Sequence, residues 1–180
     1  MRAAILETSG EPLVLRDDVT IAPPKAHQVL VRVRHCGVCH SDLSLADGVF
    51  PSPTPVILGH EAAGVVEEVG ADVRGLAVGD HVLLTPVPPC GVCYWCVRGE
   101  PGCCVNAACI TSNAHSDGQT GLARGDTTVF RGVGLGAFGE YVVVPATGAI
   151  KIASDIPLDV ACVIGCAVQT GVGAVLNTAR

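Results

Sequence analysis

Four cysteines lie close together in one short stretch of the sequence and have the spacing of a metal site. They follow the pattern C-x2-C-x2-C-x7-C and are Cys90, Cys93, Cys96 and Cys104. Four thiolates around zinc make a closed site that stabilises structure, because no position is left for water or substrate. A disulfide scaffold is the alternative in a chain with ten cysteines, but C-x2-C spacing without a secretory signal more often indicates metal. We therefore predict a structural zinc in a lobe over residues 88–105.

A second set of possible zinc ligands is scattered along the chain. Cys39 stands in Gly-Val-Cys-His-Ser-Asp, His60 in Gly-His-Glu-Ala-Ala-Gly and Cys166 in Ile-Gly-Cys-Ala. Two thiolates and an imidazole leave a fourth zinc position open for water or substrate, which is the arrangement of a catalytic zinc. Zinc lowers the pKa of a bound oxygen by many units. Together, the two patterns predict a metalloenzyme with two zinc ions per chain, one catalytic and one structural.

Short strands with frequent Gly and Pro turns surround these residues. Apolar and β-branched runs predict strands over 2–6, 13–19, 29–35, 62–69, 81–84, 141–144 and 150–152. A short helix is expected over 39–46, ending at Gly48, and further helices over 158–164 and 169–177. Residues 105–137 are rich in Gly, Thr, Ser and Asn and predict a long loop. We expect a mainly β, barrel-like domain over 1–155, followed by linking helices over 156–180.

Composition excludes several classes of function. Apolar residues make up 49% of the 180-residue chain, but no run approaches the ~20 apolar residues that span a membrane. The net charge is −6 and no basic stripe is present, which argues against a nucleic-acid partner. The N-terminal segment reaches Glu7 too early for a secretory signal. We therefore expect a cytoplasmic protein that acts on small molecules.

Five motifs occur in the order found in the zinc-dependent medium-chain alcohol dehydrogenases, which the chain resembles over essentially its whole length. They are Gly37-Val38-Cys39-His40-Ser41-Asp42, Gly59-His60-Glu61-Ala62-Ala63-Gly64, Gly79-Asp80-His81-Val82, Phe138-Gly139-Glu140-Tyr141 and Gly165-Cys166. The resemblance implies a GroES-like catalytic domain followed by a Rossmann domain for NAD(P), and a homo-oligomer when the protein is complete. No strand followed by G-x-G-x-x-G is present. We therefore expect the chain to be truncated before its cofactor domain.

The resemblance also implies roles for residues beside the proposed ligands. Asp42 would orient the zinc-bound histidine, whose free ring nitrogen needs an acceptor. Glu61 would lie behind the metal, either binding it transiently or remaining outside its coordination shell. Ser41 would accept the proton of the alcohol. In some relatives the proton continues to a histidine three residues later, but Ser44 occupies that position here, so the proton would leave through water.

Two positions match cofactor contacts of the same family. His40 would face the cofactor pyrophosphate, and Thr170 would pack on the nicotinamide. The remaining histidines match no ligand position and are interpreted as surface or structural residues; they are His27, His35, His81 and His115.

Three functions remain open at this stage. The first is the catalytic portion of a zinc-dependent oxidoreductase that interconverts alcohols and aldehydes or ketones with hydride transfer to NAD(P). The second is a formaldehyde or thiol-adduct dehydrogenase of the same fold, which an anion-binding Arg or Lys in the pocket would favour. The third is a zinc-stabilised β-barrel that binds a partner without turnover. We expect the chain without a cofactor domain to be inactive, because hydride transfer needs an acceptor held against the substrate.

Overall fold

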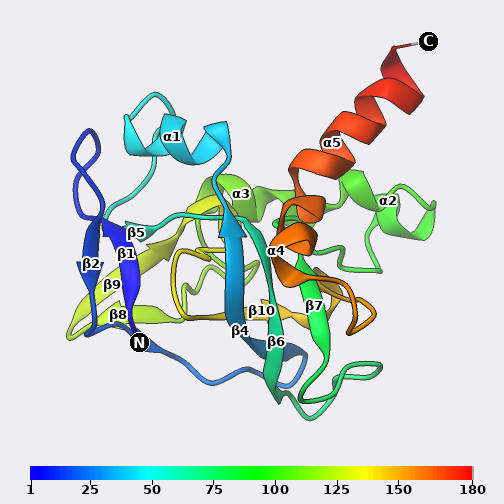
Figure 1. The fold of residues 1–180 in the computed structure, drawn as a ribbon, viewed down its shortest axis with the longest axis horizontal. Helices are drawn as coiled ribbons and strands as arrows, with labels where there is room; N and C mark the ends of the chain where they lie inside the picture. The colour runs from blue at the N-terminus through cyan, green and yellow to red at the C-terminus, as the bar shows by residue number, and fades with distance from the viewer. Residues whose placement is uncertain (180) are drawn as a thin grey trace.

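The computed structural model describes residues 1–179, which form mainly β-structure with short helices (Figure 1). The strands are β1 (Ala3–Leu6), β2 (Val14–Arg16), β3 (Thr20–Ile21), β4 (Gln28–Gly37), β5 (Val56–Ile57), β6 (Glu61–Val69), β7 (His81–Leu84), β8 (Leu122–Arg124), β9 (Thr127–Arg131), β10 (Tyr141–Pro145) and β11 (Ala149–Lys151). The α-helices are α1 (His40–Ala46), α2 (Tyr94–Val97), α3 (Cys109–Ser112), α4 (Leu158–Ala161) and α5 (Ala167–Gly173). Short helical segments are η1 (Pro101–Cys103), η2 (Val105–Ala108), η3 (Gly132–Gly134), η4 (Ala146–Gly148), η5 (Cys162–Gly165) and η6 (Ala174–Thr178). The predicted mainly β fold class with short helices is confirmed.

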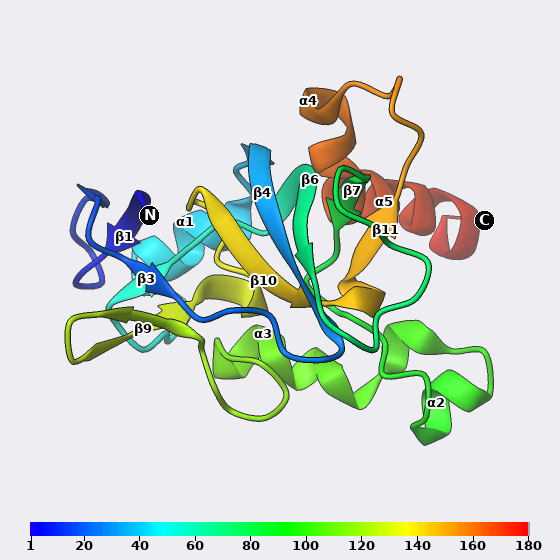
Figure 2. The ribbon, with the colours of Figure 1, turned by 90° about the horizontal axis from the view of Figure 1, so that it is seen from below.

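The strands form two sheets. One has the order β2-β1-β5-β9-β8-β3 and the other the order β10-β4-β6-β7-β11. Neighbouring strands are antiparallel, except that β5 and β9 run parallel. Figure 2 shows the N-terminal strands and the lobe around α2 at opposite ends of the molecule, with β4, β6 and β10 between them. The strand β4 runs directly into Cys39 and α1, so the larger core of the second sheet supports one of the predicted zinc ligands.

The sequence pattern of β4 explains how that sheet packs. Val29 and Val31 are fully buried, whereas Arg32 and Arg34 are exposed, as the two faces of a half-buried strand require. The buried valines join a core cluster with Val66 of β6 and other residues from β7, β10 and β11. Burial of these β-branched side chains removes apolar surface from water and stabilises the sheet.

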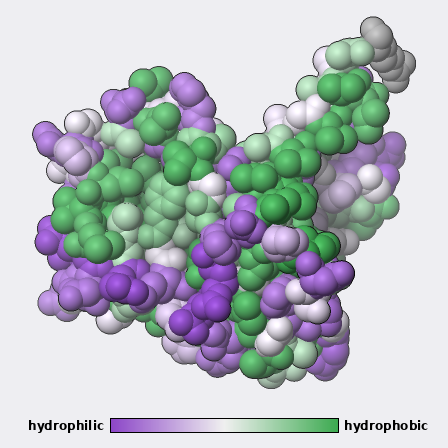
Figure 3. All heavy atoms as spheres, in the orientation of Figure 1, coloured by the Kyte–Doolittle hydropathy of each residue, from purple (hydrophilic) through white to green (hydrophobic). Residues whose placement is uncertain are grey.

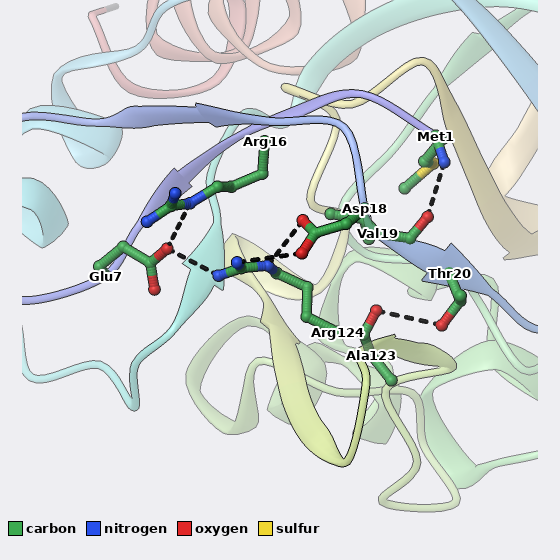
Figure 4. Close-up of polar contacts among 8 residues, drawn as sticks. All are labelled: Met1, Glu7, Arg16, Asp18, Val19, Thr20, Ala123 and Arg124. Atoms are coloured by element: carbon green, nitrogen blue, oxygen red, sulfur yellow. Dashed lines mark hydrogen bonds and ion pairs between the residues drawn. The ribbon is translucent and has the colours of Figure 1, made fainter.

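A set of ion pairs ties the N-terminal strands to the β8–β9 hairpin (Figure 4). Arg124 of β8 binds both carboxylate oxygens of Asp18 through Nε and Nη2, at 2.9 and 3.2 Å. Its Nη1 also donates to Glu7 Oε1 at 2.8 Å, which accepts from Arg16 Nε as well. The N-terminal ammonium of Met1 donates to the carbonyl oxygen of Val19 at 2.6 Å. These contacts are partly exposed and therefore add little to the free energy of unfolding. We infer that they mainly position the N-terminal strands against the β8–β9 hairpin.

The prediction of a long loop over residues 105–137 is wrong. The stretch contains α3 and the hairpin of β8 and β9, in which Arg124 faces Thr127 across the two-residue turn Gly125-Asp126. Gly125 has φ +53°, which suits the tight turns that join antiparallel strands. The run from Thr127 to Phe130 is β-branched and aromatic, and it pairs with β5 as well as β8.

The last helices project from the body of the molecule. In Figure 1, α5 extends away from both sheets, and Figure 3 shows this arm as largely hydrophobic. Its exposed apolar side chains are Val168, Val172, Val175 and Leu176. Within residues 1–179, no single helix is long and apolar enough to span a membrane. The bent pair Leu158–Gly165 and Ala167–Thr178 meets the length and composition criteria only when its two helices are counted together. The boundary at 155/156 and the linking role of 156–180 remain predictions, and residue 180 lies outside the described residues.

Candidate metal centres

The four cysteines of the lobe converge on one point. The sulfur atoms of Cys90, Cys93, Cys96 and Cys104 all lie within 4.8 Å of one another. The lobe consists of tight turns around α2, η1 and η2, and it brings backbone N–H groups to the sulfurs. Cys93 N donates to Cys90 Sγ at 3.3 Å, and Asn106 N donates to Cys104 Sγ at 3.4 Å. Such donors favour thiolates over thiols.

The thiols of this cluster differ in pKa. Hydrogen bonds from the backbone of Cys96 and Val105 lower the pKa of the Cys93 thiol to about 6. Burial and the neighbouring sulfurs raise the pKa of the Cys96 thiol to about 11. Four thiolates at this spacing repel one another, and a divalent cation removes that repulsion. The donor set therefore fits a tetrahedral zinc ion.

A second cluster lies where β4, β6 and η5 meet. One ligand atom from each of Cys39, His60, Glu61 and Cys166 lies within 4.8 Å of the others. Cys39 precedes α1, His60 and Glu61 stand at the start of β6, and Cys166 follows η5. The fold thus brings together residues that are up to 127 positions apart, as the spacing of the motifs predicted for the three proposed ligands.

Two glycines allow this approach. Gly59 has φ +88°, and a Cβ there would lie 2.5 Å from the Phe138 ring, so a larger residue would displace the backbone of His60. A Cβ on Gly165 would lie 2.1 Å from the carbonyl oxygen of Leu84. The absence of a side chain lets η5 pack against β7, which places Cys166 beside the start of β6.

Asp42 is the hydrogen-bonding hub of the second cluster. Its Oδ1 accepts from the backbone N–H of Gly59 at 2.9 Å and lies 3.2 Å from His60 Nδ1. Its Oδ2 accepts from the backbone N–H of Cys39 at 3.1 Å. Asp42 and His60 are each only 2% exposed. Because Nδ1 is engaged by the carboxylate, Nε2 is the ring nitrogen that remains for a metal.

The electrostatics of this cluster also fit a cation. Burial raises the pKa of the Cys166 thiol to about 12, and the neighbouring Cys39 and Glu61 add to the shift. For Cys39 burial acts in the same direction, but hydrogen bonds from Ser41 and His60 outweigh it and lower the thiol pKa. The Asp42 carboxylate raises the pKa of His60 against the opposing effect of burial. Two sulfurs, one imidazole nitrogen and a buried carboxylate are a donor set that zinc accepts.

The other predicted site residues lie near this cluster on α1 and α5. Ser41 Oγ is 3.7 Å from Cys39 Sγ, which places its hydroxyl beside a proposed ligand. His40 is exposed, and its Nδ1 lies 3.4 Å from the hydroxyl of the buried Ser44. Thr170 is exposed one helical turn after Cys166, and it borders a cavity of about 550 Å³ between α5 and the lobe.

Residues 25–154 match the family model of the alcohol dehydrogenase GroES-like domain. The chain belongs to this family. It is 38% identical to alcohol dehydrogenase class-3 of Drosophila melanogaster, over 99% of this chain and 48% of that protein. It is 37% identical to S-(hydroxymethyl)glutathione dehydrogenase of Aspergillus oryzae, over 99% of this chain and 47% of that protein. The chain therefore spans about half the length of these relatives.

Solved structures agree with this assignment. An alcohol dehydrogenase zinc-binding domain protein from Burkholderia ambifaria has a TM-score of 0.91 and 38% identity, over 98% of this chain and 48% of that chain. Benzyl alcohol dehydrogenase from Acinetobacter calcoaceticus has a TM-score of 0.88 and 33% identity, over 98% of this chain and 47% of that chain. The resemblance drawn from the five motifs is thus confirmed at the level of family and fold.

Sequence reasoning missed the residues that support the ligands from outside the motifs. Nothing near Gly37 indicated that a Cβ there would lie 2.5 Å from Glu61 Oε2, so that this glycine makes room for the carboxylate. The sequence also did not predict that the backbone N–H of Gly59 donates a hydrogen bond to Asp42 Oδ1. The sequence does show a glycine shortly before each proposed ligand. The reason for each glycine becomes clear only from its contacts with strands that are distant in sequence.

Proposed function

We propose that this chain is the catalytic-domain portion of a zinc-dependent oxidoreductase that interconverts alcohols and aldehydes or ketones, with hydride transfer to NAD(P) in the complete protein. In this proposal Cys39, His60 and Cys166 hold a catalytic zinc, and the lobe cysteines hold a structural one. The observation that carries it is the convergence of two thiols, an imidazole and a buried carboxylate within 4.8 Å, separate from the four-cysteine cluster.

Each residue of the second cluster, and each residue beside it, has its own role in this proposal. Bound zinc supplies a Lewis acid that polarises an alcohol or carbonyl oxygen. Asp42 holds the His60 ring by its Nδ1 and fixes Cys39 through its backbone N–H. Ser41 Oγ receives the proton that the alcohol loses and passes it to water. Glu61 is buried, with a carboxylate oxygen within 4.8 Å of the other ligand atoms, so it would either bind the metal transiently or stay outside its coordination shell.

The cofactor contacts belong to the same proposal. His40 begins α1 and is exposed, so its ring is accessible to an anionic group of NAD(P). Thr170 is exposed on α5, one turn beyond Cys166, so a nicotinamide that reaches the site would meet it. In this proposal the short helices that follow residue 156 link the catalytic domain to a cofactor domain.

Metal analysis tests the proposal directly. We expect two zinc ions per chain, one of which a chelator removes without unfolding the protein. His60→Ala should lower the content to one zinc while the protein remains folded. In the complete protein, the same variant should abolish alcohol-dependent reduction of NAD(P). A single zinc that resists chelation, and that His60→Ala does not affect, would instead support a non-catalytic zinc-stabilised module.

A second substrate class is favoured by two relatives, which are named alcohol dehydrogenase class-3 and S-(hydroxymethyl)glutathione dehydrogenase. The formaldehyde adduct of glutathione carries carboxylates, and an Arg or Lys at the pocket would be needed to bind them. The benzyl alcohol dehydrogenase structure favours an uncharged aromatic alcohol instead. Comparing kcat/KM of the complete protein for benzyl alcohol with that for formaldehyde plus glutathione separates the two classes.

A further inference from the structure

A small cavity lies between the start of β4, the segment before β8 and strand β10. Its volume is about 160 Å³, and its walls include Ala22, Pro23 and Val143 as well as the side chains of Gln28 and His115. None of its lining residues belongs to either cysteine cluster. The cavity is similar in size to one of about 150 Å³ that holds benzene in another protein, so it accommodates a ligand of a few heavy atoms.

A buried arginine fixes the state of His115. Arg131 is 1% exposed, and its Nη1 donates to His115 Nε2 at 2.9 Å. Since a guanidinium only donates, His115 Nε2 must accept, and the ring proton therefore lies on Nδ1. Burial and the adjacent guanidinium lower the pKa of His115 to about 3, which keeps the ring neutral. His115 Nδ1–H is thus a fixed hydrogen-bond donor.

Gln28 supplies a second donor. Its Oε1 accepts from the backbone N–H of Lys25 at 2.9 Å, which identifies the other side-chain atom as Nε2. Gln28 and His115 are each only 9% exposed. Within residues 1–179, neither Gln28 Nε2 nor His115 Nδ1 has a protein acceptor, and neither is enclosed by protein. Because both side chains line the cavity, we infer that both donors point into it.

The charges around the cavity favour an anion. Among the described residues, no carboxylate pairs with Arg131, whose other donors meet the carbonyl oxygens of Thr120, Gly134 and Val143. Lys25 also lines the cavity, but it forms an ion pair with Asp117, so its charge is already compensated. The uncompensated charge is that of Arg131, which reaches the cavity through His115. A buried cation without a counter-ion is costly.

We propose that this cavity binds a small aliphatic carboxylate, whose oxygens accept from Gln28 Nε2 and His115 Nδ1 and whose apolar end contacts Ala22, Pro23 and Val143. The carboxylate would serve as counter-ion to Arg131 through the His115 ring. Acetate and propionate fit the volume. For the four heavy atoms of acetate, the Kd is expected to be no tighter than about 40 μM.

Nuclear magnetic resonance of the isotope-labelled chain tests the proposal. Acetate is titrated while the signals of the Gln28 side-chain amide and the His115 ring nitrogens are followed, because these report on the cavity even if acetate also reaches a zinc ion elsewhere. We expect saturable shifts with acetate and at least a ~10-fold weaker response to acetamide, which has the same shape without charge. No saturable shift, as for a cavity that holds water only, or equal shifts with acetamide, would overturn the proposal.

Gln28→Glu provides a matched variant. It retains the acceptor for the Lys25 N–H and replaces the donor in the cavity by an oxygen, so acetate binding should be lost while the backbone spectrum stays folded. Asn177→Asp makes the same chemical change at an exposed position of η6 and should leave binding unchanged. Retention of acetate binding by Gln28→Glu would contradict the proposed donor. Should that variant fail to fold, the comparison of acetate with acetamide on the unaltered chain still decides.

Discussion

Substitution of Asp42 by Asn tests how the second cluster, formed by Cys39, His60, Glu61 and Cys166, is held together. The change keeps an acceptor at Oδ1 for the Gly59 N–H and for His60. It replaces Oδ2, which accepts from the Cys39 N–H, with an NH2 group that cannot accept. A buried donor left without an acceptor costs about 1–3 kcal/mol. Loss of the charge that orients a ligating histidine typically lowers metal affinity by about 10- to 100-fold. We therefore expect both a lower free energy of unfolding and weaker binding of the removable zinc.

Competition with a chromogenic chelator measures the zinc affinity, and denaturant unfolding measures the stability. Asp47→Asn is the matched control, because Asp47 ends the same helix α1 and is exposed. It should change neither quantity by a measurable amount. If Asp42→Asn held its removable zinc as tightly as the unaltered chain, the role of Asp42 as the anchor of His60 would be wrong.

Further substitutions give independent tests. Cys93→Ser should release the lobe zinc and expose residues 88–105 to proteolysis, because a structural zinc contributes folding free energy directly; an intact, protease-resistant lobe would contradict this. Ser41→Ala in the complete protein should lower kcat by about 10²–10⁴-fold at unchanged zinc content, and a wild-type rate would remove Ser41 from the proton path. Gly165→Ala should weaken the removable zinc, since the new Cβ would meet a carbonyl oxygen at 2.1 Å; unchanged chelator competition would show that the backbone accommodates it. Lowering pH from about 6.5 toward 3 should steadily reduce the free energy of unfolding, because the unfolded chain binds a proton that buried His115 does not; His115→Gln should flatten this dependence, and an unchanged slope would refute the assignment.

Much of the β-structure was predictable because its pattern is local. The strand predicted over 81–84 is observed as His81–Leu84, and the strand predicted over 29–35 is observed as Gln28–Gly37. The helix predicted over 39–46 is observed as His40–Ala46 and ends before Gly48, whose φ is +74°. These elements carry their signals in neighbouring residues: alternating burial, a capping position and a terminating glycine.

The β8–β9 hairpin was missed because the Gly- and Thr-rich composition around it predicts a loop, although β8 and β9 pair locally across a two-residue turn. Arg131 reads as a surface residue in sequence, yet its guanidinium is buried against main-chain carbonyls and His115. Similarly, the motifs predict Asp42 and His60 as site residues. They do not predict that the backbone N–H of Gly59 donates to the same Asp42 carboxylate, because this contact forms only when the start of β6 lies beside α1. The family's motifs identified the proposed ligands, whereas the packing that holds them depends on pairs far apart in sequence.

The long connections of the first sheet bear on how the chain folds during synthesis. Asp18 and Thr20 bond to Arg124 and Ala123, more than 100 residues later, and Arg2 pairs with Glu140 across 138 residues. At about 5–20 residues per second, roughly 5–30 s separate the emergence of these partners from the ribosome. Throughout that interval β3 lacks its partner β8, although β1 can already pair with β2 and, once residue 57 is made, with β5. Topology of this kind gives slow folding, and the N-terminal strands are therefore among the segments that most need protection until Glu140 has been added.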